Sequence, residues 1–302
     1  MSEPRESVAV VVVTYNRAAL LTRMLAGLAA LDRTPDVVIV VDNASTDHTA
    51  TVLAGAAASW EHLPLQVITP EENLGGAGGF HTGMQAAHEQ GFDRIWLMDD
   101  DVVPAPDCLS VLMAVDPDHA DCLMSVREDL KGRLAEKAAT RFDLRNPLRI
   151  KPKLSMVEDD YADRASMPEL VEIQNVAFEG FMVRREVIDR IGLPDPRFFI
   201  FYDDVDFALR ARRAGYRIWA VRDAVLVRQL DFDQQHDLAG WKGYYMFRNL
   251  FVVHLRYGEN ALVRAKPWLI SAGVVALSPL RGGRAEASNV RRALRDARGL
   301  RD

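Results

Sequence analysis

The N-terminal part of the chain alternates between short, fully apolar runs and longer segments with helical periodicity. Residues 8–13 and 37–41 are apolar at every position and rich in valine. Such runs are typical of strands buried on both faces, as in a parallel sheet. Apolar residues recur at helical spacing over 18–31, a second helix is predicted over about 49–58, and 65–68 predicts a short strand. This order predicts right-handed βαβ units.

The same alternation continues to residue 228 and then changes character. Residues 95–98 predict another buried strand, 216–221 and 224–227 predict two more, and from residue 238 onward the pattern is helical. We therefore predict an α/β fold with a Rossmann-like, mixed but mainly parallel sheet flanked by helices. The predicted division is a sheet domain over 1–228 and a C-terminal helical region over 229–302.

Two segments of the sheet domain have weaker patterns. Residues 130–169 are polar, mixed in charge and contain three prolines, which predicts a long irregular segment that covers the site. Residues 172–183 predict a strand pair or a bulged strand around Glu179 and Gly180. A short helix over 184–191, closed by Gly192, follows.

Composition narrows the function classes. The chain has 302 residues, 49% of them hydrophobic, and a net charge of -6, which argues against a general nucleic-acid binder. Cys108 and Cys122 have no metal-type spacing and indicate no disulfide framework. The polar start is unlike a signal peptide, and no apolar run reaches the ~18 residues of a membrane span, since 268–280 is short and interrupted. These features predict a cytoplasmic protein.

Three consecutive aspartates, Asp99, Asp100 and Asp101, follow the apolar run of residues 95–98. Adjacent carboxylates repel one another, and a divalent cation is the simplest partner that favours them. Their hard oxygen ligands suit Mg²⁺ or Mn²⁺. The alternative is a solvated acidic turn.

Polar residues also follow the first two predicted strands, at the edge where open α/β sheets bind ligands. Asp42 can accept hydrogen bonds from a base or a ribose, and Arg17 can reach a diphosphate. The alternative is that Asp42 and Ser45 only cap a turn and a helix. Thr14 or Asn16 is placed to cap the first helix.

A glycine-rich segment precedes a helix predicted over 81–89. Glycines remove side chains where the backbone approaches something closely, and a helix N-terminus is ready for anionic oxygens. The segment lacks the Lys-Ser/Thr of a P-loop and is not in the first βα turn of a dinucleotide site. Its residues of interest are Asn73, Gly75, Gly76, Gly78 and Gly79.

A second acidic cluster, Asp203, Asp204 and Asp206, follows the aromatic run 198–202 and begins a helix that ends near Gly215. The helix dipole favours one or two such charges, but it does not explain three beside an aromatic run. Because an apolar run again ends in carboxylates, we expect both acidic clusters to lie at the carboxyl ends of neighbouring strands.

The C-terminal segment 281–302 contains seven arginines and three acidic residues and predicts an amphipathic helix. One interpretation is a solvated helix end. The other is contact with anionic lipid or with a polyprenyl-phosphate acceptor at the inner face of the plasma membrane.

Taken together, these motifs resemble the inverting glycosyltransferases of family two, which have the GT-A fold. The resemblance covers about residues 8 to 250 and rests on Thr14-Tyr15-Asn16-Arg17, Asp42-Asn43-Ala44-Ser45, the aspartate triplet and residues 199–206. A narrower likeness is to the actinobacterial galactofuranosyltransferases, carried by residues 73–80, 98–101 and 241–249. Related rhamnosyltransferases have similar segments.

The resemblance implies a role for each matching residue. Asp99 and Asp101 would bind the metal, Mn²⁺ or Mg²⁺, and Asp204 would be the catalytic base. Asp203, Trp241, Tyr244 and Arg248 would lie on the acceptor side or support it. The nucleotide-sugar donor would be bound by Thr14, Tyr15, Arg17, Asp42, Asn73, Gly75, Gly76, Gly78, Gly79 and Asp100.

Arg228 departs from the family pattern, because the galactan-building relatives have a histidine metal ligand at this place. An arginine stays protonated and cannot bind a metal. Gln229 or His236 can replace the histidine, or Arg228 itself can neutralise the diphosphate.

The predicted reaction moves a sugar, with UDP-galactofuranose as the first expectation and dTDP-rhamnose as the alternative, onto a hydroxyl of a glycan or polyprenyl-linked glycan. An alternative of a different class is a non-catalytic nucleotide-sugar-binding protein. The absence of the acidic residues would have favoured it, but all of them are present. A nucleotidyltransferase would need a basic glycine-rich loop near the N-terminus, and Thr14-Tyr15-Asn16-Arg17 is not one.

Overall fold

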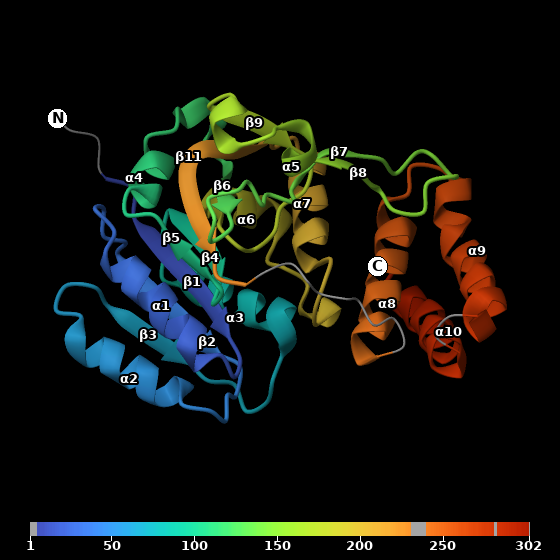
Figure 1. The fold of residues 1–302 in the computed structure, drawn as a ribbon, viewed down its shortest axis with the longest axis horizontal. Helices are drawn as coiled ribbons and strands as arrows, with labels where there is room; N and C mark the ends of the chain where they lie inside the picture. Colours follow the sequence, from blue (N-terminus) through green and yellow to red (C-terminus); the bar gives the residue numbers. More distant parts are fainter. Residues whose placement is uncertain (1–4, 231–239, 281–282, 302) are drawn as a thin grey trace.

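The computed structural model describes residues 5–230, 240–280 and 283–301, and a nine-stranded sheet forms its centre (Figure 1). Along the sheet the strands follow the order β3-β2-β1-β4-β10-β6-β11-β5, and β9 pairs with β11 beside this path. The strands are β1 (Val8–Thr14), β2 (Val37–Asp42), β3 (Leu65–Ile68), β4 (Arg94–Asp99), β5 (Val102–Pro104), β6 (Cys122–Glu128), β9 (Leu170–Ile173), β10 (Phe181–Arg184) and β11 (Ile218–Arg228).

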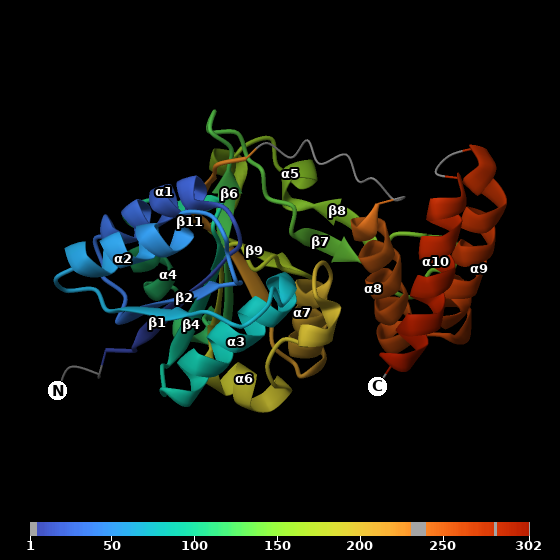
Figure 2. The same ribbon diagram turned by 90° about the horizontal axis from the view of Figure 1, so that it is seen from below.

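Helices cover both faces of this sheet (Figure 2). Val8, Val10 and Val12 of β1 pack with α1 (Ala18–Ala29), α2 (Thr49–Ser59) and α4 (Cys108–Met113). Ala9, Val11 and Val13 pack in the cluster that contains α3 (Gly75–Glu89), α6 (Arg185–Ile191) and α7 (Asp203–Arg213). Because alternate residues of a strand face opposite sides, both sets must be apolar, as the unbroken run predicts.

The predicted fold class is confirmed, and most strand–helix boundaries agree within a few residues. β1 pairs in parallel with β2 and β4, while β10 is antiparallel to β4 and β6. The two strands predicted over 216–227 are one strand, β11, whose register shifts between Val221 and Val225. The polar residues at this bulge mimic a turn in the sequence.

The segment 130–169 contains more regular structure than its sequence predicts. β7 (Ala139–Phe142) and β8 (Lys153–Met156) pair antiparallel, and α5 (Val157–Asp160) follows directly. Residues 172–183 do not form a strand pair with each other. Instead β9 joins β11, and β10 enters the sheet between β4 and β6.

The aromatic run 198–202 is not a strand, contrary to the prediction. Phe199, Phe201 and Tyr202 have positive φ angles of 61°, 68° and 66°. Such angles are costly for bulky residues and incompatible with a strand. They form a strained turn between the 3₁₀ helix η3 (Pro196–Phe198) and α7.

Within the described residues after β11, the chain forms the helices α8 (Trp241–Tyr257), α9 (Ala261–Leu277) and α10 (Gly283–Gly299). Figures 1 and 2 show α8 next to the sheet domain, with α9 and α10 on its outer side. Phe251 and Val252 of α8 share a cluster with Ala77 of α3 and Phe198, and Val253 packs near Val205 and Leu209 of α7. The helical region is therefore joined to the sheet domain by common cores.

One C-terminal segment passes the length and composition test for a membrane span. Residues Ala261–Leu280, which include α9 and the 3₁₀ helix η4 (Ser278–Leu280), have a mean hydropathy of 1.3, and 28% of the segment is buried within the protein. The expectation that no segment reaches this length is thus corrected, because the helix continues through Arg264 and Lys266. The same test is passed by some helices of soluble proteins.

Candidate active site

The candidate site lies at one edge of the sheet. β1, β2, β4, β6 and β11 all end there, and β10 begins there because it runs in the opposite direction. This geometry brings Asp42, the aspartate triplet, Arg127, Glu179 and Arg228 to a common edge. It is the edge at which ligands bind in open α/β sheets.

Asp100 is anchored by two neighbouring side chains. The Thr14 hydroxyl donates a hydrogen bond to Asp100 Oδ2 at 2.8 Å, and Arg17 Nη1 lies 3.1 Å from Asp100 Oδ1. The same guanidinium lies 3.4 Å from Asp101 Oδ2. The predicted donor-binding residues of the first strand therefore lie against the triplet. Here the first-strand threonine binds an aspartate and does not cap the helix.

Asp99 and Asp101 lie in a buried, negatively charged environment that a bound cation would stabilise. Burial raises the pKa of Asp99 well above its usual value, and the charges of Glu179, Asp101 and Asp100 raise it further. The pKa of Asp101 is also raised, by burial and by Glu179. Asp101 Oδ1 is buried and accepts no hydrogen bond from the described residues. Two buried carboxylates with raised pKa values and one oxygen without a hydrogen bond fit a divalent cation.

The protein ligands for such a cation are few. Within residues 5–230, 240–280 and 283–301, no group of three or more acidic, histidine or cysteine side chains is arranged to hold a metal. Arg228 Nη2 lies 3.9 Å from Asp101 Oδ2, so this arginine adds positive charge. The Gln229 amide group donates to the carbonyl of Val227. His236 lies outside the described residues.

Glu179 is a site residue that the sequence did not reveal. Its carboxylate lies 2.6 Å from Arg127 Nη1 and 3.1 Å from Arg228 Nη1. Although burial opposes ionisation, these arginines hold the pKa of Glu179 below its usual value. Arg127 is itself buried and bonded through two nitrogens to Glu136. The only signal in the sequence is a charged residue between Phe178 and Gly180 in an apolar run.

The loops after β1 and β2 brace each other. Asp42 Oδ1 accepts a hydrogen bond from the Ser45 amide at 3.0 Å, and the Ser45 hydroxyl accepts one from the Asn16 amide. Asp47 accepts from the Ala18 amide, so Asp47 fills the cap position of α1 that the sequence assigned to Thr14 or Asn16. Asp42 therefore caps the turn after β2 through Oδ1, whereas Ser45 braces the loop after β1 and does not cap a helix.

The glycine-rich segment is the first part of α3 and not a loop. Gly75 has a φ angle of +69°, and a Cβ there would lie 2.1 Å from the carbonyl oxygen of Phe199. A Cβ on Gly79 would meet Val13 at 2.6 Å. These glycines are required by close packing against the protein itself. Gly76, in contrast, has open space around its Cα. The Asn73 side chain accepts a hydrogen bond from the Gly75 amide.

The strained turn 198–202 is held by α8. Asn249 Nδ2 donates to the carbonyls of Phe198, Ile200 and Phe201 at 2.8–3.0 Å. Arg248 Nη2 donates to the carbonyls of Arg197 and Phe198. Backbone strain of this kind persists only where the surroundings over-determine it, and it is common at functional sites. The turn leads directly into Asp203 and Asp204.

Asp204 has the properties of a proton acceptor. Burial raises its pKa to about 6, and this rise is opposed by a hydrogen bond from the Val205 amide and by the positive charge of Lys153. Glu179 raises the pKa of Asp204 as well. Asp203 is more deeply buried, and its pKa is raised well above its usual value by burial and by Asp204. Lys153 comes from β8, a strand that the sequence did not predict.

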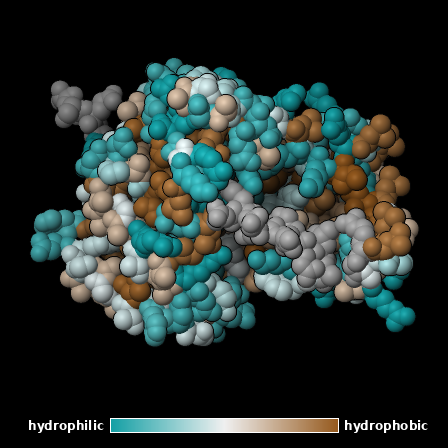
Figure 3. All heavy atoms as spheres, in the orientation of Figure 1, coloured by the Kyte–Doolittle hydropathy of each residue, from teal (hydrophilic) through white to brown (hydrophobic). Residues whose placement is uncertain are grey.

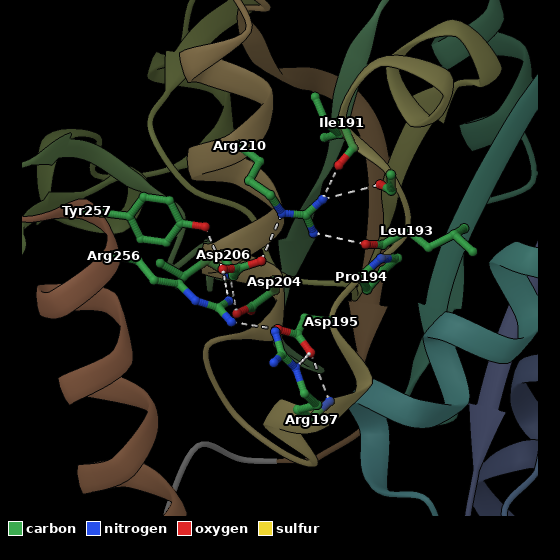
Figure 4. A network of polar contacts seen from close by, with 12 residues as sticks. Ile191, Leu193, Pro194, Asp195, Arg197, Asp204, Asp206, Arg210, Arg256 and Tyr257 are labelled. Carbon is green, nitrogen blue, oxygen red and sulfur yellow. Dashed lines mark hydrogen bonds and ion pairs between the residues drawn. The ribbon is translucent and has the colours of Figure 1, made fainter. Parts of the chain in front are cut away.

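Asp206 has a structural environment (Figure 4). Its fully buried carboxylate is bonded by Arg210 and Arg256 at 2.9 Å and by the Tyr257 hydroxyl at 2.5 Å. Arg256 also pairs with Asp195. Since Arg256 and Tyr257 belong to α8, this network joins the helix that carries Asp204 to the C-terminal region.

An aromatic cavity of about 720 Å³ lies between the sheet edge and the C-terminal helices. The rings of Phe199 and Tyr245 stack at 4.9 Å between centroids, and Trp241 is exposed beside them. Arg248 lies behind the ring of Tyr245, so it supports this wall. The lining residues are Tyr15, Asn73, Phe199, Trp241, Tyr244, Tyr245, Arg292 and Asp296. The cavity thus joins residues predicted for the donor to residues predicted for the acceptor.

Comparison with known proteins identifies close sequence relatives. A family model described as "Glycosyltransferase like family 2" matches residues 4–243. Galactofuranosyltransferase GlfT1 of Mycolicibacterium smegmatis is 32% identical over 213 residues, which cover 70% of this chain and 67% of the relative. GlfT1 of Mycobacterium tuberculosis is 30% identical over 277 residues, or 87% of each chain.

Solved structures share the fold. The mannosyltransferase PcManGT of Pyrobaculum calidifontis, solved with GDP-Man and Mn²⁺, has a TM-score of 0.58 at 20% identity, covering 99% of this chain and 88% of that one. GalNAc-T7, solved with UDP, GalNAc and Mn²⁺, has a TM-score of 0.64 at 15% identity, covering 95% and 55%. The chain therefore belongs to the family-2 glycosyltransferases, has the GT-A fold and is a hexosyltransferase.

Proposed function

We propose that this glycosyltransferase moves a galactofuranosyl residue from UDP-galactofuranose to a hydroxyl of a glycan or polyprenyl-linked glycan. The observation that carries the proposal is electrostatic. The charge of Glu179 raises the pKa of Asp99, Asp101 and Asp204, which supports one site that contains both acidic clusters. The choice of sugar rests on the relatives named galactofuranosyltransferase at 30–32% identity.

Asp204 would accept the proton of the acceptor hydroxyl as that oxygen attacks the anomeric carbon. A pKa of about 6 leaves Asp204 ionised at neutral pH, yet basic enough to share a proton in the transition state. Attack from the face opposite the leaving group inverts the anomeric centre. Asp203 and the braced turn would fix the direction of the carboxylate.

The donor side would be bound by the sheet edge. Asp99 and Asp101 would hold Mn²⁺ or Mg²⁺, and such an ion supplies positive charge beside the leaving nucleoside diphosphate. Arg17 and Arg228, which already flank the triplet, would add cationic hydrogen-bond donors for the phosphates. Asp42 would accept hydrogen bonds from the uridine.

The acceptor would occupy the aromatic cavity. The exposed ring of Trp241 offers apolar surface for a sugar ring, while Asp296 and Asn73 offer polar groups for its hydroxyls. Filling this cavity would also exclude water, which competes as an acceptor.

The test is release of UDP from UDP-galactofuranose with a lipid-linked galactan fragment as acceptor, with dTDP-rhamnose in parallel. The reaction is run with Mn²⁺ and with chelator. Asp204→Asn should lower kcat by at least about 100-fold and leave UDP affinity nearly unchanged, because only the proton acceptor is lost. Asp223→Asn, an exposed aspartate on β11, is the matched control.

Each arm can contradict one part of the proposal. Faster turnover of dTDP-rhamnose than of UDP-galactofuranose would mean that the transferred sugar is rhamnose. Full activity in the presence of chelator would mean that the reaction does not require a divalent metal. Equal loss of UDP binding and transfer in Asp204→Asn would mean that this residue is not the base.

A further inference from the structure

The outward face of α9 is apolar along its length. On α9, Leu269 is 69% exposed and Leu262, Trp268 and Leu277 are exposed as well, and Leu280 of the following η4 is 85% exposed. Figure 3 shows apolar residues along the edge of the molecule where Figure 1 places α9. Exposed apolar surface of this extent indicates an interaction site.

The periodicity of α9 places these residues on one face. Leu262, Leu269, Ala272 and Ala276 recur at intervals of three, four or seven residues and are all exposed. The opposite face carries Val263, Pro267 and Ser271, which are buried. From residue 267 to residue 280 the sequence has no charged side chain.

A row of arginines on α10 lies beside this face. Arg284, Arg291, Arg295 and Arg298 recur at intervals of seven, four and three residues, and all are exposed. A cavity of about 830 Å³ lies between this row and Val275, Ser278 and Pro279 of α9 and η4. Arg284, Arg291 and Arg298 make no ion pair with any residue in the described part of the chain, whereas Arg295 pairs with Asp296.

Charge is distributed unevenly between the two parts of the chain. Residues 240–302 contain twelve lysines and arginines and four aspartates and glutamates. The whole chain, in contrast, has 37 basic and 43 acidic residues. The positive charge is therefore concentrated next to the apolar helix.

We propose that the exposed face of α9 and the arginine row of α10, together the α9–α10 face, dock onto a bilayer that contains anionic phospholipid. The leucines of α9 enter the boundary between headgroups and acyl chains, and the arginines bind lipid phosphates. This combination of apolar penetration and basic charge is typical of proteins that lie on a membrane.

Two other occupants fit the α9–α10 face less well. A symmetric contact with a second copy would bring the two arginine rows together, where they repel each other. A membrane-spanning α9 would have to leave α8 and α10, with which Ile270 and Val274 share an apolar cluster. Docking on the bilayer keeps those contacts.

The orientation that follows links docking to the site already described. Arg292 lines both the cavity beside the arginine row and the aromatic cavity. A docked molecule therefore has its aromatic cavity next to the membrane surface. Docking itself does not depend on the proposed function.

The experiment is flotation of the full chain with vesicles of phosphatidylcholine alone and of phosphatidylcholine with phosphatidylglycerol. We expect at least about tenfold stronger partition into the anionic vesicles, reversed by high salt. Leu269→Glu with Leu277→Glu, and separately Arg284→Gln with Arg291→Gln, should each weaken partition by about tenfold or more.

Val67→Glu on β3 and Arg190→Gln on α6 are the matched controls, since both residues are exposed and lie outside the C-terminal helices. Thermal unfolding of every variant checks that the fold is kept. No difference between the two kinds of vesicle, or equal partition of the variants and the controls, overturns the proposal. A dimer in light scattering that the leucine substitutions separate identifies a second copy as the occupant, and resistance to alkaline carbonate extraction identifies a spanning helix. Either result also overturns it.

Discussion

Asp203, Asp204 and Asp206 show how three neighbouring carboxylates of one motif acquire different roles. The carboxylate of Asp206 is bonded by Arg210, Arg256 and Tyr257. Among the described residues, the carboxylate of Asp204 has no such set of partners, and burial raises its pKa to about 6. A pKa near 6, as Asp204 has, suits a group that must exchange a proton at physiological pH. The difference arises from partners on α8 and β8 that are remote in sequence.

The pH dependence of transfer should report the ionisation of Asp204. A base must be ionised, so kcat/KM should fall about tenfold per pH unit below about 6. Lys153 favours the ionised form. Lys153→Met should therefore raise the pKa of Asp204 and move the acid limb to higher pH.

Lys151→Met, an exposed lysine two residues away, should leave that limb in place. The measurement is a pH profile of kcat/KM for the three proteins. An unchanged profile in Lys153→Met would mean that Asp204 is not the titrating group.

Among single residues, the sequence predicts the site residues that directly follow a strand. It misses the residues that act through charge interactions with distant side chains. Thr14, Arg17 and the triplet come together because the ends of parallel strands meet at one edge. Glu179 and Lys153 could not be predicted, because their charge matters only through neighbours fixed by the tertiary fold.

At the scale of elements, α3 and the turn 198–202 form one unit. The Ala77 amide donates to the carbonyl of Phe199, and Gly75 allows that carbonyl to come close. Glycine disfavours helices, which is why the sequence predicts a helix that starts only at residue 81. Packing overrides that propensity, and the turn escapes prediction because α8 imposes its positive φ angles.

This arrangement predicts opposite effects for two adjacent glycines. Gly75→Ala should lower the free energy of unfolding by at least about 2 kcal/mol, because the residue has positive φ and its Cβ would clash with Phe199. Gly76→Ala should be neutral or stabilise by up to about 1 kcal/mol, since its Cβ meets nothing.

Urea unfolding of both variants and the unaltered chain supplies the comparison. A cost at Gly76 equal to that at Gly75 would show that neither the positive φ of Gly75 nor its contact with Phe199 determines the outcome.

At the scale of the whole molecule, α8 belongs energetically with the sheet domain. It shares apolar clusters with α3 and α7, braces the strained turn through Asn249 and closes the Asp206 network. α9, in contrast, is buried along one face only. The sequence predicts the parallel strands and the helical character of the C-terminal region, but the division at residue 228 is based on a change of periodicity and remains a prediction.

Native-state hydrogen exchange should separate these two classes of helix. Amides in the middle of α8 should exchange with the same free energy as those of β1 and β4, because α8 opens only when the shared cores open. Amides of α9 should exchange through smaller openings in the absence of lipid. Equal protection of α8 and α9, both below that of the sheet, would instead indicate a separate helical domain.

The Asp206 network also bears on how such enzymes can recombine during evolution. An exchange of C-terminal segments between relatives that joined the chains just after β11 would supply a foreign α8 and leave the buried Asp206 dependent on a partner that had not evolved with it. A junction near Gly258, after Tyr257, would keep every bond of the network within one parent. For the Asp206 network, the part of the chain that has to be inherited together therefore extends through α8.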